Sequence, residues 1–471
     1  MTKPTLDTMI FNGRIVTGDG ATEIETGSVL ISGQAIVDVI AGVIDRPTNT
    51  QVIDATGCTI LPGIINGHAH GCTVGPTMPS GSRPFALNDI EYQLNRHLLS
   101  GTTTLLNVCG LALIEELAAT LIDHPLEVAI STAHTPANLS AALAVDGTGL
   151  SERHSKITIE AMIRSGAKAL GEAGGGQTLG GGAQDYRFIP DGVHKMTGIR
   201  IHPKLARALK EAIVGRKLDH PVADLKAVDH LLQGSTLRSA IDGSALSDLV
   251  RATVMPPVSL SLEGLAEVAV ASSRFGLPSI FHNAAPTADT LMRLAVAHPK
   301  ARMIAAHSNH PSFEPGECVA VARNLRSNGV IIDVSTLDCI STRWRNQPAN
   351  LDLLVSQRLV DTLSTDFAGG DWDTILDAIN RIVRFGHLTL AQAVALATGN
   401  VARALPELAS DRGLIASGRL ADIAIVENHN LSRVRHVIKK GRMVVANGAI
   451  CSRDHGDRIA DRFDNVSTNS A

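Results

Sequence analysis

Two histidines separated by a single residue, His68 and His70, follow an apolar run at positions 58–67. In a β-strand, side chains two residues apart point to the same side. We expect the run to form a strand with both imidazoles on one face near its end. Imidazole is a common ligand of divalent transition metals. A lone His-x-His pair is more often a solvated surface feature, so the pair needs partners elsewhere in the chain.

Four further side chains of metal-binding type each follow an apolar, β-rich run. They are Glu172, His282, His307 and Asp366. Six imidazole and carboxylate ligands exceed the three that a single catalytic zinc usually takes from protein. We therefore expect two divalent metal ions bridged by Glu172, which ends a strand before a Gly-rich segment. These ligands favour zinc, with iron, cobalt and manganese as alternatives.

A site of this kind predicts hydrolysis. Two metals about 3.5–4 Å apart can share a hydroxide, which is a nucleophile at neutral pH, while one ion polarises the substrate oxygen. Asp366 would bind one metal and also act as the catalytic residue that carries the proton from the water to the leaving group. The expected reaction is hydrolysis of a polarised C=O group with an amine as leaving group.

The middle of the chain alternates short apolar runs with amphipathic helical patterns. Alternation of this kind predicts βα units and a parallel sheet. Eight strands are expected, at 60–65, 103–108, 127–132, 167–172, 278–282, 302–307, 329–335 and 360–366. They fit a (β/α)₈ TIM barrel, in which catalytic groups lie at the carboxyl ends of the strands. A doubly wound open sheet would not bring the ends of strands one, four, five, six and eight to one point.

The two ends of the chain both read as short strands separated by glycine-containing turns. We expect residues 1–61 and 409–455 to form one small composite β-sandwich domain, with the barrel domain at 62–408 between them. The strand spacing breaks at about 174–257, a stretch too long for an ordinary βα loop. We interpret it as an insertion over the mouth of the barrel, either a substrate lid or a subunit contact.

The composition limits the partners. The 471 residues are 44% hydrophobic and 3% aromatic, and the net charge is −4. These values argue against nucleic acid and membrane surfaces and favour a small-molecule substrate. The six cysteines are scattered, which favours reduced thiols, and no signal peptide or transmembrane helix is visible. We expect a cytoplasmic homo-oligomer, either a dimer or a tetramer.

In its six predicted metal ligands, His68, His70, Glu172, His282, His307 and Asp366, the chain resembles the amidohydrolase superfamily of metal-dependent hydrolases. Further likeness lies in the segments 11–16, 54–63, 397–402 and 413–422. Many members bridge their metals with a carboxylated lysine on strand four, whereas Glu172 takes that place here, as in enamidase, a cyclic ene-lactam hydrolase. The resemblance implies hydrolysis of a C–N bond in a small cyclic amide. Lys168 shares the strand parity of Glu172 and is expected to point inward, deeper in the barrel and paired with a core carboxylate.

Several residues have weaker claims to substrate binding. His134 follows the third strand, and Arg343 and Arg345 follow the seventh, where they could receive a substrate carboxylate. His310 is expected to be a solvated loop residue. The alternative functions are a carbamate, urea or thiocarbamate hydrolase, a single-metal deaminase of an amino-heterocycle, and a non-catalytic scaffold. The deaminases usually carry a glutamate shortly after the strand-five histidine, and here Asn283 follows His282.

Overall fold

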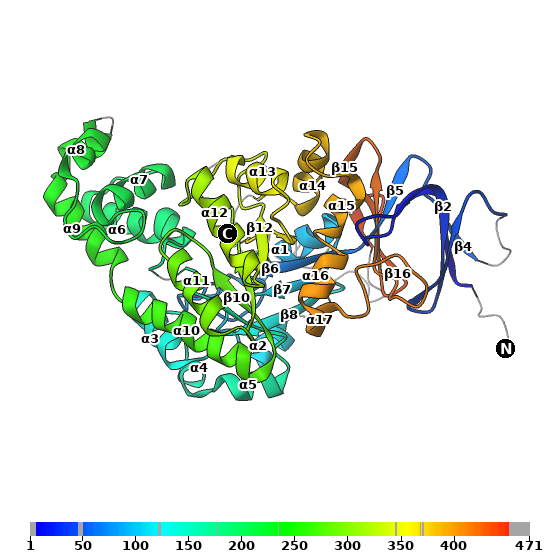
Figure 1. Cartoon of the computed structure of the whole chain (residues 1–471), viewed down its shortest axis with the longest axis horizontal. Coiled ribbons are helices and arrows are strands. Elements are labelled where there is room, and N and C mark those ends of the chain that lie inside the picture. Colours follow the sequence, from blue (N-terminus) through cyan, green and yellow to red (C-terminus); the bar gives the residue numbers. More distant parts are fainter. Residues whose placement is uncertain are drawn as a thin grey trace, which may run out of the picture.

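The fold was analysed in a computed structural model of the chain. The structure describes residues 6–45, 50–120, 124–176, 178–233, 235–343, 346–367, 369 and 372–451. Figure 1 shows a central barrel with a sheet from both chain ends on its right and a group of helices at its left end.

The barrel consists of eight parallel strands in sequence order. They are β6 (Ile64–Ala69), β7 (Thr102–Asn107), β8 (Glu127–Thr132), β9 (Ala169–Ala173), β10 (Pro278–His282), β11 (Arg302–Ala306), β12 (Ile331–Ser335) and β13 (Thr362–Ser364). The last strand returns to the first: Phe367 forms a parallel bridge with Ala69, and the Asp366 amide donates to the His68 carbonyl at 3.0 Å. The predicted (β/α)₈ barrel is confirmed.

Helices cover the outside of the barrel (Figure 1). They are α1 (Leu87–Leu99), α2 (Ile114–Thr120), α3 (Pro136–Val145), α4 (Glu152–Lys156), α5 (Ile159–Ser165), α10 (Val258–Phe275), α11 (Ala288–Ala297), α12 (Pro315–Ser327), α13 (Ala349–Ser356), α14 (Ile375–Arg384) and α15 (Leu390–Ala395). In α10 the buried residues Leu265, Val268, Ala269 and Ser272 recur at helical spacing. Two short helices, α16 (Gly399–Ala404) and α17 (Pro406–Ala409), share a hydrophobic core with the barrel strands.

One helical stretch, Gly243–Phe275, is long and apolar enough to cross a membrane by length and composition alone. In the structure it comprises two helices, α9 (Gly243–Val254) and α10, and α10 packs against α3 and strands β9 and β10. Burial of one face of α10 against the barrel accounts for part of this apolar character.

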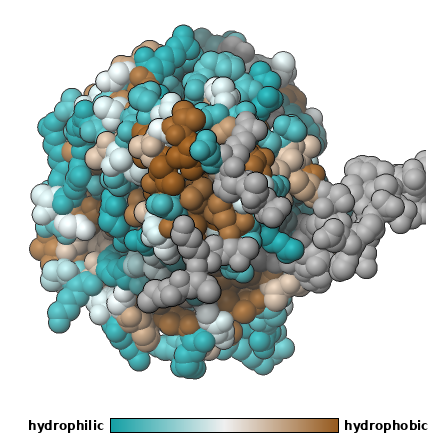
Figure 2. Space-filling view, turned by 90° about the vertical axis from the view of Figure 1, so that its right-hand side faces the viewer, coloured by the Kyte–Doolittle hydropathy of each residue, from teal (hydrophilic) through white to brown (hydrophobic). Residues whose placement is uncertain are grey.

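A second, nine-stranded sheet joins the two ends of the chain. Its strands are β1 (Thr8–Val16), β2 (Glu23–Ser32), β3 (Ala35–Ala41), β4 (Gln51–Asp54), β5 (Cys58–Pro62), β14 (Ile423–Glu427), β15 (Asn430–Lys439), β16 (Arg442–Ala446) and β17 (Ala449–Ile450). β5 pairs with β1 on one side and with β14 on the other, so it connects the two termini. Figure 2 looks onto this end of the molecule, where hydrophobic side chains gather near the centre of the face.

The expected first barrel strand at 60–65 is wrong in its position. Residues up to Pro62 belong to β5 of the terminal sheet, and the barrel strand β6 starts at Ile64. The apolar run at 58–67 is therefore two strands in two sheets, separated only at Gly63. A Cβ atom at Gly63 would lie 2.3 Å from Thr103 Oγ1, so the chain passes too close to β7 for a side chain there. The domain boundaries inferred from the sequence stay predictions.

The stretch between β9 and β10 contains its own helices. They are η1 (Gln184–Phe188), α6 (Ile189–Thr197), α7 (Pro203–Val214), α8 (Leu225–Gln233), η2 (Thr236–Ser239) and α9. This helical insertion lies at the end of the molecule opposite the terminal sheet (Figure 1). It contacts the loops after β11 and β12: Arg216 donates to the Ser312 carbonyl at 3.1 Å, and Arg207 donates to Asn346 Oδ1 at 3.3 Å.

Candidate metal centre

The six predicted ligands meet at the carboxyl ends of five barrel strands. His68 lies within β6 with His70 just beyond it, Glu172 lies in β9, and His282 is the last residue of β10. His307 directly follows β11, and Asp366 lies two residues past β13. The four histidines and Glu172 are buried, and Asp366 has a side chain that is 18% exposed. Among the six, Asp366 is thus the group best placed to meet a substrate.

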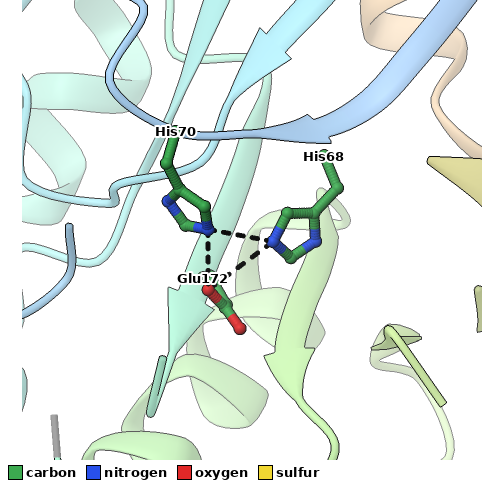
Figure 3. Close-up of side chains that lie close together, drawn as sticks. All are labelled: His68, His70 and Glu172. Atoms are coloured by element: carbon green, nitrogen blue, oxygen red, sulfur yellow. Dashed lines mark hydrogen bonds and ion pairs between the residues drawn. The ribbon is translucent and has the colours of Figure 1, made fainter. Parts of the chain in front are cut away.

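The carboxylate of Glu172 stands between two pairs of imidazoles. Figure 3 shows His68 and His70 pointing toward it, with Oε2 at 3.6 Å from His68 Nε2 and 3.3 Å from His70 Nε2. Its other oxygen, Oε1, lies 3.1 Å from His282 Nδ1 and 3.0 Å from His307 Nε2. Each oxygen therefore has its own pair of nitrogens, which is the arrangement of a bridging carboxylate.

Asp366 completes the first of these groups. Its Oδ1 lies 3.2 Å from the Nε2 atoms of both His68 and His70, which are themselves 3.1 Å apart. Three triads have ligand atoms within 4.8 Å of one another: His68, His70 and Glu172; His68, His307 and Asp366; and Glu172, His282 and His307. Neutral imidazole and carboxylate are ligands that suit a divalent transition metal, so the residues present fit the predicted metals.

A local irregularity of β9 aims Glu172 at the cluster. Between two pairings with β10, Ser279 with Leu170 and Phe281 with Ala173, β9 contains one residue more than β10. Gly171 sits in this bulge with φ of +94°, and a Cβ atom there would lie 2.1 Å from the Ile280 carbonyl oxygen. Bulges re-aim side chains next to functional sites. Only glycine at position 171 allows β10 to approach this closely.

The backbone of two cluster residues lies in the left-handed region. His307 has φ of +34° and Asp366 has φ of +50°. Non-glycine residues rarely adopt such values, and they concentrate at sites where the surroundings fix a side chain in place. At Asp366 the amide is held by the His68 carbonyl, so the backbone of one ligand fixes the direction of another.

Charge within the cluster is balanced between acids and imidazoles. Burial alone would lower the pKa of His68, but the charges of Glu172 and Asp366 outweigh it and raise that pKa to about 10. Burial would likewise raise the pKa of both carboxyls, yet the neighbouring imidazoles hold both well below their ordinary values. Both acids are therefore ionised, and the positive charge that balances them can be supplied by protons or by metal ions.

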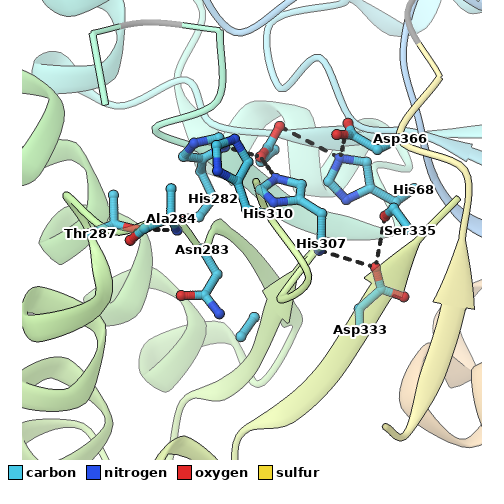
Figure 4. A network of polar contacts seen from close by, with 12 residues as sticks. His68, His282, Asn283, Ala284, Thr287, His307, His310, Asp333, Ser335 and Asp366 are labelled. Atoms are coloured by element: carbon cyan, nitrogen blue, oxygen red, sulfur yellow. Dashed lines mark hydrogen bonds and ion pairs between the residues drawn. The ribbon is translucent and has the colours of Figure 1, made fainter. Parts of the chain in front are cut away.

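A layer of polar residues supports the cluster from inside the barrel. Asn66 donates from Nδ2 to Thr365 Oγ1 at 2.8 Å, which ties β6 to the segment that leads to Asp366. Figure 4 shows Asp333 beneath His307, whose amide donates to Asp333 Oδ2 at 3.4 Å. Asp333 also accepts hydrogen bonds from Ser364 at 2.7 Å and Thr362 at 2.8 Å. Burial raises the pKa of Asp333, and the positive charge of His68 and the two hydroxyl groups oppose that rise.

A small cavity opens onto the cluster. The space available to the centre of a water molecule is about 40 Å³. Besides five of the six predicted ligands, all except His68, its wall includes Met78, Leu337, Tyr186 of the helical insertion, His310, and glycines 175, 176, 181 and 182. A Cβ atom at Gly175 would lie 2.1 Å from Glu172 Oε2, so the backbone reaches the Glu172 carboxylate directly.

His310 corrects the sequence interpretation, which placed it in a solvated loop. It is buried, it lines the cavity, and its ring centroid lies 5.3 Å from that of His282. The Ser312 amide donates to His310 Nδ1 at 3.1 Å, which leaves the ring proton on Nε2. Tyr186 was also missed. For His310, the only signal in the sequence was its position three residues after His307. For Tyr186, it was its position inside the insertion.

The structure does not bring the other substrate-binding candidates to the cavity. His134 is buried, and its Nδ1 lies 3.0 Å from Thr132 Oγ1, but it is not among the described lining residues. Arg343 is exposed, donates to the Ile340 carbonyl at 2.9 Å and lines a different groove. Arg345 lies outside the described residues.

The expected inward direction of Lys168 is wrong. β9 begins one residue later, at Ala169, and Lys168 is exposed. The bulge at Gly171 shifts the alternation of side chains between Lys168 and Glu172, so the two residues do not share a face of the strand. Lys168 is thus remote from both the barrel core and the metal cluster.

Comparison with known proteins agrees with this geometry. Residues 245–444 match the model of the Amidohydrolase family. This segment of the chain is similar to that family. Among curated proteins, the chain is 35% identical over 129 residues to a D-hydantoinase of Geobacillus stearothermophilus. It is also 44% identical over 80 residues to adenine deaminase 2 of Agrobacterium fabrum. These matches span 27% and 17% of this chain, and only 23% and 12% of the relatives.

Solved structures share the fold over nearly the whole chain. A β-aspartyl dipeptidase from Fervidobacterium islandicum AW-1 is 16% identical with a TM-score of 0.55, covering 97% of this chain and 100% of the other. A D-aminoacylase described with a binuclear metal centre is 13% identical with a TM-score of 0.60, covering 95% and 98%. The enamidase-like subgroup is not represented among these neighbours, so that finer assignment stays a prediction.

Proposed function

We propose that the chain is a metal-dependent hydrolase that cleaves the C–N bond of a small cyclic amide, such as a lactam or ene-lactam. The observation that carries this proposal is the position of Glu172, whose two oxygens each face a separate pair of imidazoles. Such a carboxylate supports a pair of divalent ions, with zinc favoured.

The residues divide into two sets of ligands. His68, His70 and Asp366 surround Glu172 Oε2, while His282 and His307 surround Glu172 Oε1. When bound, the metal ions polarise the substrate carbonyl and lower the pKa of water toward neutrality. The chain itself supplies the ligand geometry, the ionised carboxylates and the enclosing wall.

Asp366 is the group proposed to move the proton. Its Oδ1 faces His68 and His70, so Oδ2 is the atom that would accept the proton of the attacking water and deliver it to the leaving nitrogen. His310 and Tyr186 line the same cavity and are proposed to orient the substrate. The small volume of the cavity supports a small substrate.

Hydrolytic deamination of an amino-heterocycle is a second candidate, because adenine deaminases are among the relatives with local similarity. The residue after His282 speaks against it. Asn283 follows in place of an acid, and its Nδ2 donates to Ser308 Oγ at 3.0 Å. The likeness to a D-hydantoinase supports the cyclic amide instead. The cytoplasmic location and the homo-oligomeric state stay predictions from the sequence.

Two measurements on one purified sample test the proposal. Elemental analysis would report the metal content, and a screen of lactams, imides, ureas and adenine would report ring opening or ammonia release. We expect bound divalent metal and ring opening of a cyclic amide. Ammonia release from adenine alone would support the deaminase, and a protein that binds no metal would support a non-catalytic scaffold.

A further inference from the structure

His68 faces two environments through its two ring nitrogens. Its Nε2 points into the metal cluster, whereas its Nδ1 is buried and has no hydrogen-bond partner among the described residues. If Nε2 binds a metal ion, Nδ1 must carry the ring proton. A buried donor without an acceptor is costly, and metal-binding histidines almost always donate this N–H to a carboxylate, a carbonyl or a water molecule.

A second small cavity lies inside the barrel beside His68. It is lined by three polar side chains, those of His68, Asp333 and Thr362, and otherwise by Gly67 and apolar side chains of β10, β11 and the end of α16. The space open to the centre of a water molecule is about 10 Å³. One buried water needs roughly this volume and two to four polar partners. The cavity therefore has the size and the polar groups for a single water.

Asp333 has unused capacity to accept a hydrogen bond. Its Oδ2 accepts from Ser364 Oγ at 2.7 Å and, at 3.4 Å, from Ser335 Oγ and the His307 amide. Its Oδ1 accepts from Thr362 Oγ1 at 2.8 Å. Each carboxylate oxygen offers about two acceptor positions, so the free position is on Oδ1. Figure 4 shows Asp333 beneath His307 and His68, on β12 and facing the barrel interior.

We infer that one buried water molecule joins His68 Nδ1 to the carboxylate of Asp333, and that Asp333 is thereby a positioning residue for the metal centre. The inference rests on the proposed metal centre. The water accepts the Nδ1 proton and donates to Asp333, which fixes the His68 ring with Nε2 as the metal-binding atom. Of the four ligand histidines, only His68 borders this cavity among the described residues.

Zinc affinity tests the inference without any substrate. Metal-free protein would be titrated with zinc against a fluorescent chelator, and Asp333→Asn is expected to weaken zinc binding about 10- to 100-fold. Ala404→Val is the second variant, because it fills the cavity while Asp333 stays intact, and it should shift affinity in the same direction. Thermal unfolding of each metal-free variant would show that it is folded.

Asp361→Asn is the matched control. Asp361 precedes β13, accepts from the Ile332 amide at 3.0 Å and pairs with Arg326 at 2.8 Å, away from the metal cluster. The zinc affinity of the Asp361→Asn variant should equal that of the unmodified protein. Equal affinity for Asp333→Asn and Ala404→Val would overturn the inference while leaving the proposed function intact. An unmodified protein that binds no zinc would instead defeat the proposed function itself.

A crystal structure of the zinc-loaded protein gives the second readout. We expect one ordered water within hydrogen-bond distance of His68 Nδ1 and Asp333. An empty cavity, or direct contact between the two side chains, would overturn the inference even if the variants bind zinc weakly.

Discussion

The two ends of the barrel both hold carboxylates, buried or half-buried, but they balance the negative charge in different ways. At the amino end, Glu127 and Asp422 contact fixed cations: Arg412 lies 2.7 Å from Glu127, and Lys439 lies 2.6 Å from Asp422. At the carboxyl end, the ion-pair partners of Glu172 and Asp366 among the described residues are all histidines.

The difference indicates which end is structural and which is functional. A buried carboxylate with a permanent Arg or Lys partner is balanced at every pH at which the protein folds. Imidazoles can release their protons and bind metal ions through the freed nitrogens. The amino-end cluster is therefore complete within the chain, and it joins the terminal sheet to the barrel. The carboxyl-end cluster has the residue types that could hold metal ions.

The largest expected effect is at the metal centre. His68→Ala and Asp366→Ala should each abolish detectable turnover, because one removes a ligand and the other removes both a ligand and the proton carrier. The fold should persist, as shown by an unchanged circular dichroism spectrum. His429→Ala, which changes an exposed histidine of the terminal sheet, should leave activity unchanged. Full activity in either cluster variant would refute the role of that residue.

Substitutions in the amino-end cluster should change the stability of the protein instead of its activity. Arg412→Ala removes a positive charge that pairs with the carboxylates of Glu127 and Asp422. It should therefore lower the free energy of unfolding by about 3–5 kcal/mol. Urea denaturation measures the change, and metal content per folded chain should stay the same. Arg419→Ala, whose side chain bonds a carbonyl at the exposed surface, should change stability by about 0.5 kcal/mol or less.

A matched pair of Glu→Gln substitutions separates the two ends. Glu172→Gln should reduce the metal content from two ions to at most one per chain, because an amide cannot bridge two cations. Glu127→Gln should lower stability by about 1–3 kcal/mol and leave the metal content unchanged. Elemental analysis and urea denaturation of both variants would show that Glu172→Gln changes the metal content and that Glu127→Gln changes the stability. Normal metal content in Glu172→Gln would mean that the bridge lies elsewhere.

The smallest effect is the acid dependence of the amino-end cluster. Burial alone would raise the pKa of Glu127, but the hydrogen bond from Arg412 and the charge of Lys439 lower it to about 2. A carboxyl with a depressed folded pKa stabilises the protein above its unfolded pKa, near 4.5, and loses that contribution as the pH falls toward 2. Unfolding free energies between pH 5 and about 3 should therefore fall less steeply for Glu127→Gln than for the unmodified chain. Identical slopes would contradict this assignment.

Much of the fold could be predicted from the sequence because strand parity and βα alternation are local patterns. His68 and His70 share a face, and the other ligands follow apolar runs, so a closed barrel brings them together. The start of the first barrel strand could not be predicted, because Gly63 alone separates β5 from β6 in one continuous apolar run.

The details that the sequence did not reveal depend on irregular backbone. The bulge at Gly171 decides that Glu172 faces the cluster while Lys168 is exposed, and no periodicity encodes a bulge. Loop conformation also decides that His310 lines the cavity and that Arg343 does not. The role of Asp333 in β12 depends on hydrogen bonds from the end of β11 and from β13, its two neighbouring strands, which only the assembled barrel provides.

The central claim is that Glu172 bridges two cations, and anomalous X-ray diffraction at the zinc edge from crystals of the zinc-loaded protein tests it most directly. We predict two anomalous peaks about 3.5–4 Å apart, one beside Oε2 near His68 and His70 and one beside Oε1 near His282 and His307. A single peak, or no peak at this carboxylate, would contradict the account.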